Sequence, residues 1–288
     1  MKPLPGITGV IAVLEECKMK TRILAAAVLL PLLLLVVLAA PKFLTAILFG
    51  AMASIGAYEL LNGTGLVKNL RLCVYSMIIA FWSVLWCGLG IGYAWLLLGA
   101  LIFWILLFAE TMVSGMKLTF DKIALCLAAG IIVPLLFGSI VRIHSGEHGR
   151  FFILVPFAMA FLSDTGAYFA GLNFGKHKLA PEISPKKTIE GVVGGVLCAM
   201  LGMIIYCFVL QLGFKMQVNY VAALIYGAFG AGAGVFGDLC FSVIKRQTGI
   251  KDYGNLIPGH GGILDRFDSM MVVGPLAEIL LILLPLAV

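Results

Sequence analysis

Long apolar runs, separated by short polar connections, account for most of the chain. After a mixed opening segment they fall at roughly 23–40, 43–61, 73–90, 93–110, 123–141, 151–170, 191–212, 220–240 and 270–287. A helix needs about 20 mainly apolar residues to cross the hydrocarbon core of a bilayer, and tilt absorbs small differences in length. The pattern therefore predicts an all-α polytopic membrane protein with about nine transmembrane helices.

The first run raises a separate question, because basic residues precede it as they precede the apolar core of a signal peptide. Lys18, Lys20 and Arg22 lie just before Ile23. The run is about 18 residues long, which exceeds a typical signal-peptide core, and the VLAAP sequence that closes it is a poor cleavage site. We therefore expect a retained first helix.

Composition agrees with a membrane protein and argues against a soluble or nucleic-acid-binding domain. The chain is 62% hydrophobic and 12% charged, whereas a soluble domain has about 25% charged residues. The formal net charge of +6 is modest, and there is no basic tail or basic–aromatic platform. We therefore expect membrane lipids as partners, and no nucleic acid.

The distribution of basic residues orients the predicted helices. Sixteen of the 20 Lys and Arg lie in the N-terminal segment and in every second connection after it. Because Lys and Arg accumulate on the cytoplasmic side, this predicts a cytoplasmic N-terminus and a C-terminus on the opposite side. Residues 1–150 would hold about five helices. Residues 151–288 would hold the others and two charge-rich cytoplasmic connections, 171–190 and 241–269.

The connection 241–269 alternates cations and carboxylates, and Asp238 lies just upstream of it. Its charged residues are Lys245, Arg246, Lys251, Asp252, Asp265, Arg266 and Asp268. Carboxylates can hold a hard cation while Lys and Arg hold phosphate, so the segment predicts a metal-assisted phosphate site. The alternative is a solvated loop with local salt bridges. The glycines of PGHGG favour a shaped backbone instead.

The connection 171–190 contains a second candidate phosphate site. Ser184–Pro185 is a helix-start signal, with serine as the cap and proline in the first turn. Lys186 and Lys187 would then lie in that first turn, where cations are unfavourable unless an anion binds there. The alternative is a basic patch that touches anionic lipid headgroups.

Several of these side chains also have simpler interpretations. Asp164 lies inside an apolar run, where a carboxylate is a functional candidate or a hydrogen-bond partner of Ser or Thr. Asp268 could equally be the N-cap of the last helix, and Asp265 the partner of Arg266. For His260 we favour a loop-shaping or phosphate-contacting role over that of a general base.

The segment from Ser242 to Asp268 resembles a known signature. It reads S-x-x-K-R-x4-K-D-x-G-x-x-I-P-G-H-G-G-x-x-D-R-x-D without a gap, which is similar to the phosphatidate cytidylyltransferases, the CDP-diacylglycerol synthases. The SPKKT and EG elements within Asp164–Gly191 also resemble that family.

The resemblance implies transfer of CMP from CTP to phosphatidic acid, with Mg²⁺ required and a second cation left open. It implies an active site that faces the cytoplasm, and we expect a bacterial cytoplasmic membrane. Asp238 and Asp265 would be metal ligands, with Asp164 and Asp268 as weaker candidates. Residues that would act on the phosphates or bind substrate are Lys245, Arg246, Lys251, Arg266, Ser184, Lys186, Lys187, Thr188 and His260.

Two other functions compete with this one. A CTP-dependent lipid-alcohol kinase would transfer the γ-phosphate instead, and a transporter would also use carboxylates within the membrane. Long charged connections on one face argue against a transporter. The GxxxG spacings Gly191/Gly195 and Gly230/Gly234 allow close helix packing. We favour packing within the chain and leave a homodimer open.

Overall fold

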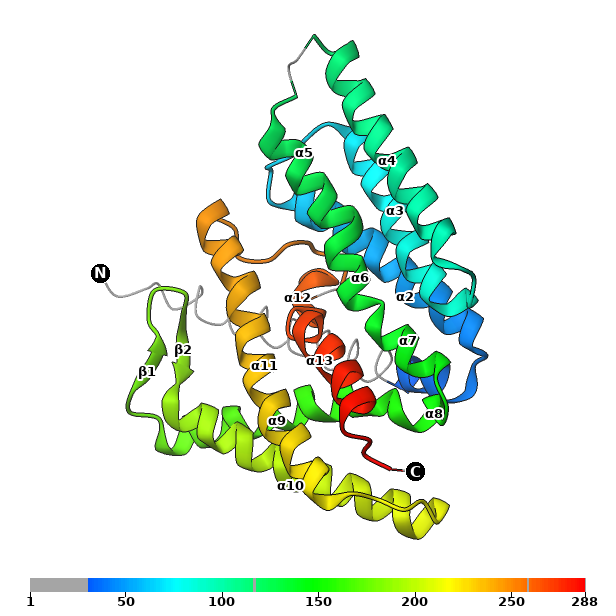
Figure 1. Ribbon diagram of the computed structural model, residues 1–288. Helices are drawn as coiled ribbons and strands as arrows, with labels where there is room; N and C mark the ends of the chain where they lie inside the picture. Colours follow the sequence, from blue (N-terminus) through cyan, green and yellow to red (C-terminus); the bar gives the residue numbers. More distant parts are fainter. Residues whose placement is uncertain (1–30, 116–117, 258, 288) are drawn as a thin grey trace, which may run out of the picture.

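The computed structural model describes residues 31–115, 118–257 and 259–287, and most of these residues are helical (Figure 1). The first half contains α2 (Lys42–Tyr58), η1 (Glu59–Gly63), α3 (Leu70–Leu89), α4 (Tyr93–Val113), α5 (Phe120–Leu127), η2 (Ala128–Ile132), α6 (Val133–Phe137) and α7 (Ser139–Ser145), where η denotes a π-helical turn. The second half contains α8 (Gly149–Phe152), α9 (Leu154–Phe174), β1 (Lys178–Ala180), β2 (Ser184–Thr188), α10 (Ile189–Phe214), α11 (Tyr220–Thr248), α12 (Leu264–Phe267) and α13 (Met270–Leu283).

The predicted class, an all-α polytopic integral membrane protein, is confirmed. Within the described residues, seven helical segments are long and apolar enough to cross a membrane, and α13 is a shorter apolar helix. Each predicted run from 43–61 to 270–287 coincides with one of these eight segments. The first run, 23–40, lies partly outside the described residues, and its described part is helical at 31–39.

Local sequence signals set the ends of the helices. Asn69 caps α3 by accepting a hydrogen bond from the Arg71 amide at 3.0 Å, and Asn219 caps α11 in the same way. Gly249 ends α11 with a φ of 70°, a left-handed conformation that favours glycine. No glycine or proline interrupts 241–248, so α11 continues past the predicted end at residue 240. The expected connection 241–269 therefore begins only after Thr248.

Small residues bring α9, α10 and α11 into close contact. A Cβ added at Gly195 would lie 2.8 Å from the Ser163 carbonyl oxygen on α9, and one at Gly191 would lie 2.9 Å from that of Ala167. A Cβ at Gly230 of α11 would collide with Met159 of α9. Both GxxxG spacings thus lie at helix contacts within the chain, where glycine lets backbones approach closely.

One end of the bundle gathers three connections that are distant in sequence. The β1–β2 hairpin contacts the end of α11, where Arg246 Nε donates to the Ile183 carbonyl at 3.0 Å. The end of η1 meets the α11–α12 connection so closely that a Cβ on Gly63 would collide with the Tyr253 carbonyl. We call this the hairpin end.

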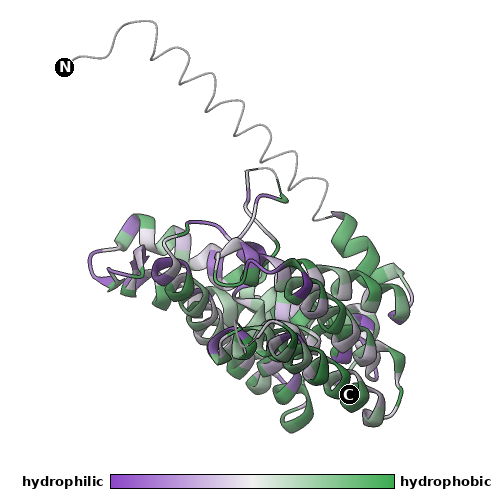
Figure 2. Cartoon of the chain, turned by 90° about the horizontal axis from the view of Figure 1, so that it is seen from above, coloured by the Kyte–Doolittle hydropathy of each residue, from purple (hydrophilic) through white to green (hydrophobic). Residues whose placement is uncertain are grey.

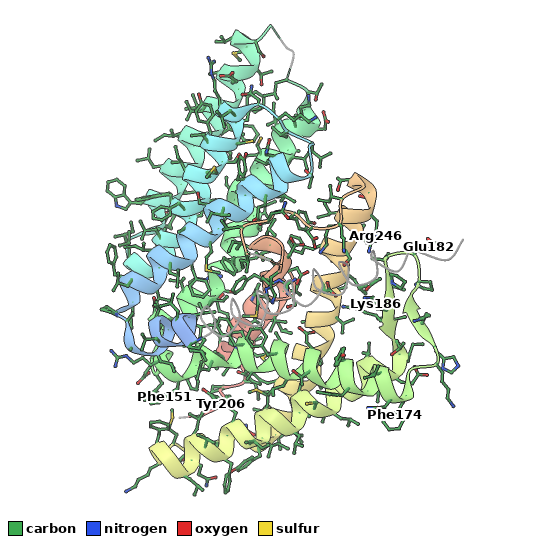
Figure 3. The ribbon with its side chains drawn as sticks, turned by 180° about the vertical axis from the view of Figure 1, so that it is seen from behind. Phe151, Phe174, Glu182, Lys186, Tyr206 and Arg246 are labelled. Carbon is green, nitrogen blue, oxygen red and sulfur yellow. The ribbon has the colours of Figure 1, made fainter. Side chains whose placement is uncertain are left out.

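Other connections meet at the opposite end. Lys42 Nζ donates to the Ser145 carbonyl at 2.8 Å, and the Asn219 amide donates to that of Leu286 at 2.9 Å. Phe151 and Tyr206 lie on this side, far from Arg246 of the hairpin end (Figure 3). Each of these contacts joins connections that the alternation of basic residues assigned to the same side, and the sidedness of the termini stays a prediction.

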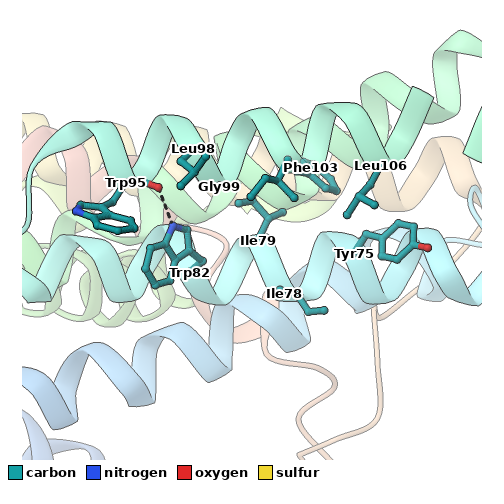
Figure 4. Close-up of a pocket in the computed structure, with 10 residues that line it drawn as sticks. Tyr75, Ile78, Ile79, Trp82, Trp95, Leu98, Gly99, Phe103 and Leu106 are labelled. Atoms are coloured by element: carbon teal, nitrogen blue, oxygen red, sulfur yellow. Dashed lines mark hydrogen bonds between the residues drawn. The ribbon is translucent and has the colours of Figure 1, made fainter. Parts of the chain in front are cut away.

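The surface between the two ends is mainly apolar, and hydrophilic segments lie chiefly in loops and near helix ends (Figure 2). Only 11% of the most apolar part of α4 is buried within the chain, so this helix is suited to face lipid. A groove of about 340 Å³ between α3 and α4 is lined by Tyr75, Trp82, Trp95, Phe103 and aliphatic side chains (Figure 4). It contains no charged group, so it is not a phosphate site.

Candidate active site

The hairpin replaces the helix start that was expected at Ser184–Pro185, and that prediction is wrong. Residues 184–188 form strand β2, paired antiparallel to β1. Helix α10 begins at Ile189, where Thr188 Oγ1 accepts a hydrogen bond from the Gly191 amide at 3.1 Å. This start places Glu190 in the first turn and keeps the adjacent lysines out of it, as the helix dipole favours.

The extended conformation of β2 sends its two lysines to opposite faces. Lys186 is exposed, whereas Lys187 is half-buried and forms an ion pair with Asp238 of α11. Figure 3 shows Lys186 beside Arg246 at the outer part of the hairpin end. Of the two lysines, the structure therefore brings only Lys187 to the carboxylates.

Asp238 has a further carboxylate on each side, and we call these three residues the carboxylate cluster: Asp164, Asp238 and Asp268. Asp164 on α9 is within electrostatic reach of Lys187 and Asp238. Gly237 packs directly on the backbone at Asp268 and Ser269, and a Cβ there would lie 3.0 Å from both. This close approach brings Asp238 beside Asp268.

Asp268 is buried and is not the N-cap of α13. Its Oδ1 accepts from the adjacent Ser269 amide at 2.8 Å, and the cap position belongs to Ser269. Burial, and next the charge of Asp238, raise the pKa of the Asp268 carboxyl above its ordinary range. The two carboxylates therefore repel each other at close range, and a bound cation would relieve that repulsion.

Asp265 has a different environment from the other aspartates. Its Oδ1 pairs with Lys245 Nζ at 3.1 Å, and its Oδ2 accepts from the Tyr253 and Gly262 amides at 2.8 and 2.9 Å. Its side chain is 2% exposed. The alternative pairing with Arg266 does not occur. Asp265 thus fixes the α11–α12 connection against α11.

Tyr253 completes this attachment. Its hydroxyl donates to the Phe241 carbonyl at 2.8 Å, and Lys245 Nζ lies 5.4 Å from the centre of its ring. Burial, followed by the charges of Asp265 and Asp268, raises the pKa of the phenol, so it remains a donor. No sequence pattern singled out Tyr253 beyond its place inside the signature.

The α11–α12 connection encloses a polar pocket of about 390 Å³. It is lined by Lys251, Asp252, Asn255, Gly259, His260, Gly261 and Arg266. A tight turn shapes one wall: the Ile257 amide donates to the Gly261 carbonyl at 2.9 Å, and Gly261 has a φ of 86° that favours glycine. The structure therefore brings together Lys251, His260 and Arg266 in one pocket, and their contact with phosphate stays a prediction.

A magnesium ion fits part of this arrangement. Among the described residues, no three His, Cys, Asp or Glu side chains converge into a complete metal site. Mg²⁺ is usually held by one or two carboxylates together with substrate phosphates and water. Asp238 and Asp268 match that donor set, while both Asp265 oxygens already accept protein hydrogen bonds. The assignment of Asp265 as a ligand stays a prediction.

One buried carboxylate of the site was missed from the sequence. Glu59, at the start of η1, accepts hydrogen bonds from the Ile263 and Leu264 amides at 3.0 and 2.9 Å. It lies in an apolar run, the same signal that singled out Asp164 and Asp238.

Fold and site together define an integral membrane protein whose polar groups gather at one end of a helical bundle. A family model described as "Cytidylyltransferase family" matches residues 20–284. The phosphatidate cytidylyltransferase of Bacillus subtilis (strain 168) is 35% identical over 277 residues, which cover 92% of this chain and 98% of that protein. The chain belongs to the cytidylyltransferase family.

Two staphylococcal relatives share a shorter region. The phosphatidate cytidylyltransferase of Staphylococcus haemolyticus (strain JCSC1435) is 41% identical over 177 residues, 62% of this chain and 66% of that protein. The one from Staphylococcus aureus (strain COL) is 41% identical over 172 residues, 60% of this chain and 64% of that protein. The matched part thus spans just under two thirds of each staphylococcal protein.

Proposed function

We propose that this protein transfers CMP from CTP to phosphatidic acid, giving CDP-diacylglycerol and pyrophosphate. An oxygen of the lipid phosphate forms a bond to the α-phosphorus of CTP, while the bond from that phosphorus to the pyrophosphate oxygen breaks. Both reactants are anions, so catalysis requires charge neutralisation and alignment more than a covalent enzyme intermediate.

The observation that carries this proposal is the position of α12 between two polar sites. This single turn places Arg266 in the polar pocket, and the chain reaches the carboxylate cluster at Asp268 two residues later. Lys251 and Arg266 would bind phosphate in the pocket, and the carboxylate cluster follows within one helical turn of the same segment. The names of the relatives support the same reaction.

Each group then has a defined task. Asp238 and Asp268 would hold Mg²⁺, which when bound neutralises phosphate charge and stabilises the departing pyrophosphate. Lys251 and Arg266 would bind phosphate oxygens. Asp265 and Lys245 keep the α11–α12 connection in place.

The proposed setting is a bacterial cytoplasmic membrane with the hairpin end facing the cytoplasm, where CTP is available. The excess of Lys and Arg in the connections of that end supports this orientation. The surrounding apolar helices would let a lipid substrate approach from within the membrane. Its phosphate group could then reach the polar groups of the site.

Labelled CTP tests the reaction. Purified full-length protein is incubated in mixed micelles with phosphatidic acid or, in a parallel reaction, with diacylglycerol as an alcohol acceptor, together with Mg²⁺ and CTP labelled at the α- or the γ-phosphate. We expect α-label in the lipid product, equimolar pyrophosphate, and no product in excess chelator. Transfer of γ-label would instead identify a lipid kinase, and absence of both would overturn the proposal.

A further inference from the structure

Glu59 is a buried carboxylate on α2–η1, about 200 positions from the segment that it contacts. It is 5% exposed. Its Oε1 accepts from the Ile263 amide at 3.0 Å and its Oε2 from the Leu264 amide at 2.9 Å. Both oxygens are therefore used, and both partners are backbone groups at the beginning of α12.

The surrounding backbone is shaped to this carboxylate. A Cβ added to Gly254 or Gly262 would collide with the Glu59 side chain. A Cβ on Gly63, one turn beyond Glu59, would collide with the Tyr253 carbonyl. The contact between η1 and the α11–α12 connection is thus closely packed, and neither segment can shift without a collision.

The segment that Glu59 holds carries the charged groups of the site. Directly after the two bonded amides come Asp265, whose oxygens fix the connection, Arg266 in the polar pocket, and Asp268 in the carboxylate cluster. A displacement of α12 would move all three together. Glu59 also begins a π-helical turn, a local irregularity that is frequent at functional sites.

From these contacts we propose that Glu59 is a positioning residue, which sets α12 so that Arg266 and Asp268 meet the substrate and its cation. It acts through the Ile263 and Leu264 amides and touches no reacting atom. The catalytic part of this inference rests on the proposed function; the positional part does not.

Glu59→Gln is the direct test, because it keeps the shape and replaces one acceptor oxygen with an NH₂ group that faces an amide donor. The matched control is Glu278→Gln, which removes a half-buried carboxylate bonded to Arg142 at 2.7 Å, away from α12. Both variants are made in the full-length protein, and their folded fraction is measured in detergent.

Two readouts separate positioning from general stability. In hydrogen exchange, peptides covering 253–267 should exchange at least about tenfold faster in Glu59→Gln, as expected when a hydrogen bond to a charged group is lost. They should be unchanged in Glu278→Gln.

The second readout is kcat per folded molecule. In Glu59→Gln it should fall at least about tenfold, and more Mg²⁺ should be needed for the half-maximal rate. In Glu278→Gln kcat should stay within about twofold of wild type.

Unchanged exchange at 253–267 in Glu59→Gln would overturn the inference, and so would wild-type kcat. If Glu278→Gln changed the exchange at 253–267 and kcat as much as Glu59→Gln does, Glu59 would only stabilise the fold in general. That result would also overturn the inference. If the wild type forms no CDP-diacylglycerol, the proposed function fails while the exchange measurement still decides the positional role.

Discussion

The aspartates Asp238 and Asp265 carry the same formal charge in different surroundings. Asp238 is half-buried, pairs with Lys187 and lies beside Asp268. Asp265 is buried and accepts two backbone hydrogen bonds besides the Lys245 contact. Removal of charge should therefore affect the two positions differently.

Asp238→Asn should abolish turnover and leave thermal stability nearly unchanged, because relief of the repulsion on Asp268 offsets the loss of the Lys187 ion pair. Asp265→Asn should abolish turnover and lower the free energy of unfolding by on the order of 3 kcal/mol, because it breaks a buried pair. The measurements are CDP-diacylglycerol formation against Mg²⁺ concentration and thermal melting in detergent. If the Asp238→Asn variant kept wild-type turnover, the assignment of Asp238 as a metal ligand would be wrong.

The lysines of β2 give a second prediction at this scale. Lys187→Met should lower kcat/KM about tenfold to 100-fold, since a charged contact to Asp238 is worth roughly 1.5–3 kcal/mol. Lys186→Met should have a smaller effect, because Lys186 is exposed whereas Lys187 is the lysine that pairs with Asp238. A larger loss for Lys186→Met would show that the outer face of the hairpin binds a substrate phosphate.

At the scale of elements, apolar periodicity located the membrane segments but not every boundary. The eight runs between 43 and 287 coincide with helical segments because length and hydropathy are set by the bilayer. The hairpin was missed because Ser184–Pro185 is also compatible with an edge strand, and Thr188 offers a better cap. The Glu59 contact could not be predicted, since it depends on tertiary packing across the chain.

The glycines of α11 give a prediction about helix packing. Gly227→Ala should lower the free energy of unfolding by about 1–3 kcal/mol, the usual cost of overpacking, because the new Cβ would collide with the Met200 backbone on α10. Gly232→Ala is the control, since nothing lies within 4 Å of a Cβ at that position. Melting curves compare the stability of the two variants. Equal stability would contradict the tight α10–α11 contact.

At the scale of the whole molecule, the connections form two groups at opposite ends of the bundle. The hairpin, the η1–α3 connection and the α11–α12 connection meet at one end. The α10–α11 connection and the last described residues meet at the other, where Val218 pairs with Ala287. A membrane that crosses the bundle between these groups would place them on different sides.

This arrangement predicts the outcome of a topology experiment. A reporter inserted in the hairpin near Lys178 should be cytoplasmic, because the basic connections gather at that end. Reporters placed in the α10–α11 connection near Val218 and after Val288 should both be on the other side. Cysteine labelling by a membrane-impermeant reagent in intact cells and in lysed cells provides the measurement. If the hairpin and Val218 tags appeared on the same side, the two-ended arrangement would be wrong. If each tag appeared on the side expected for the other, the arrangement would hold and the proposed orientation would be reversed.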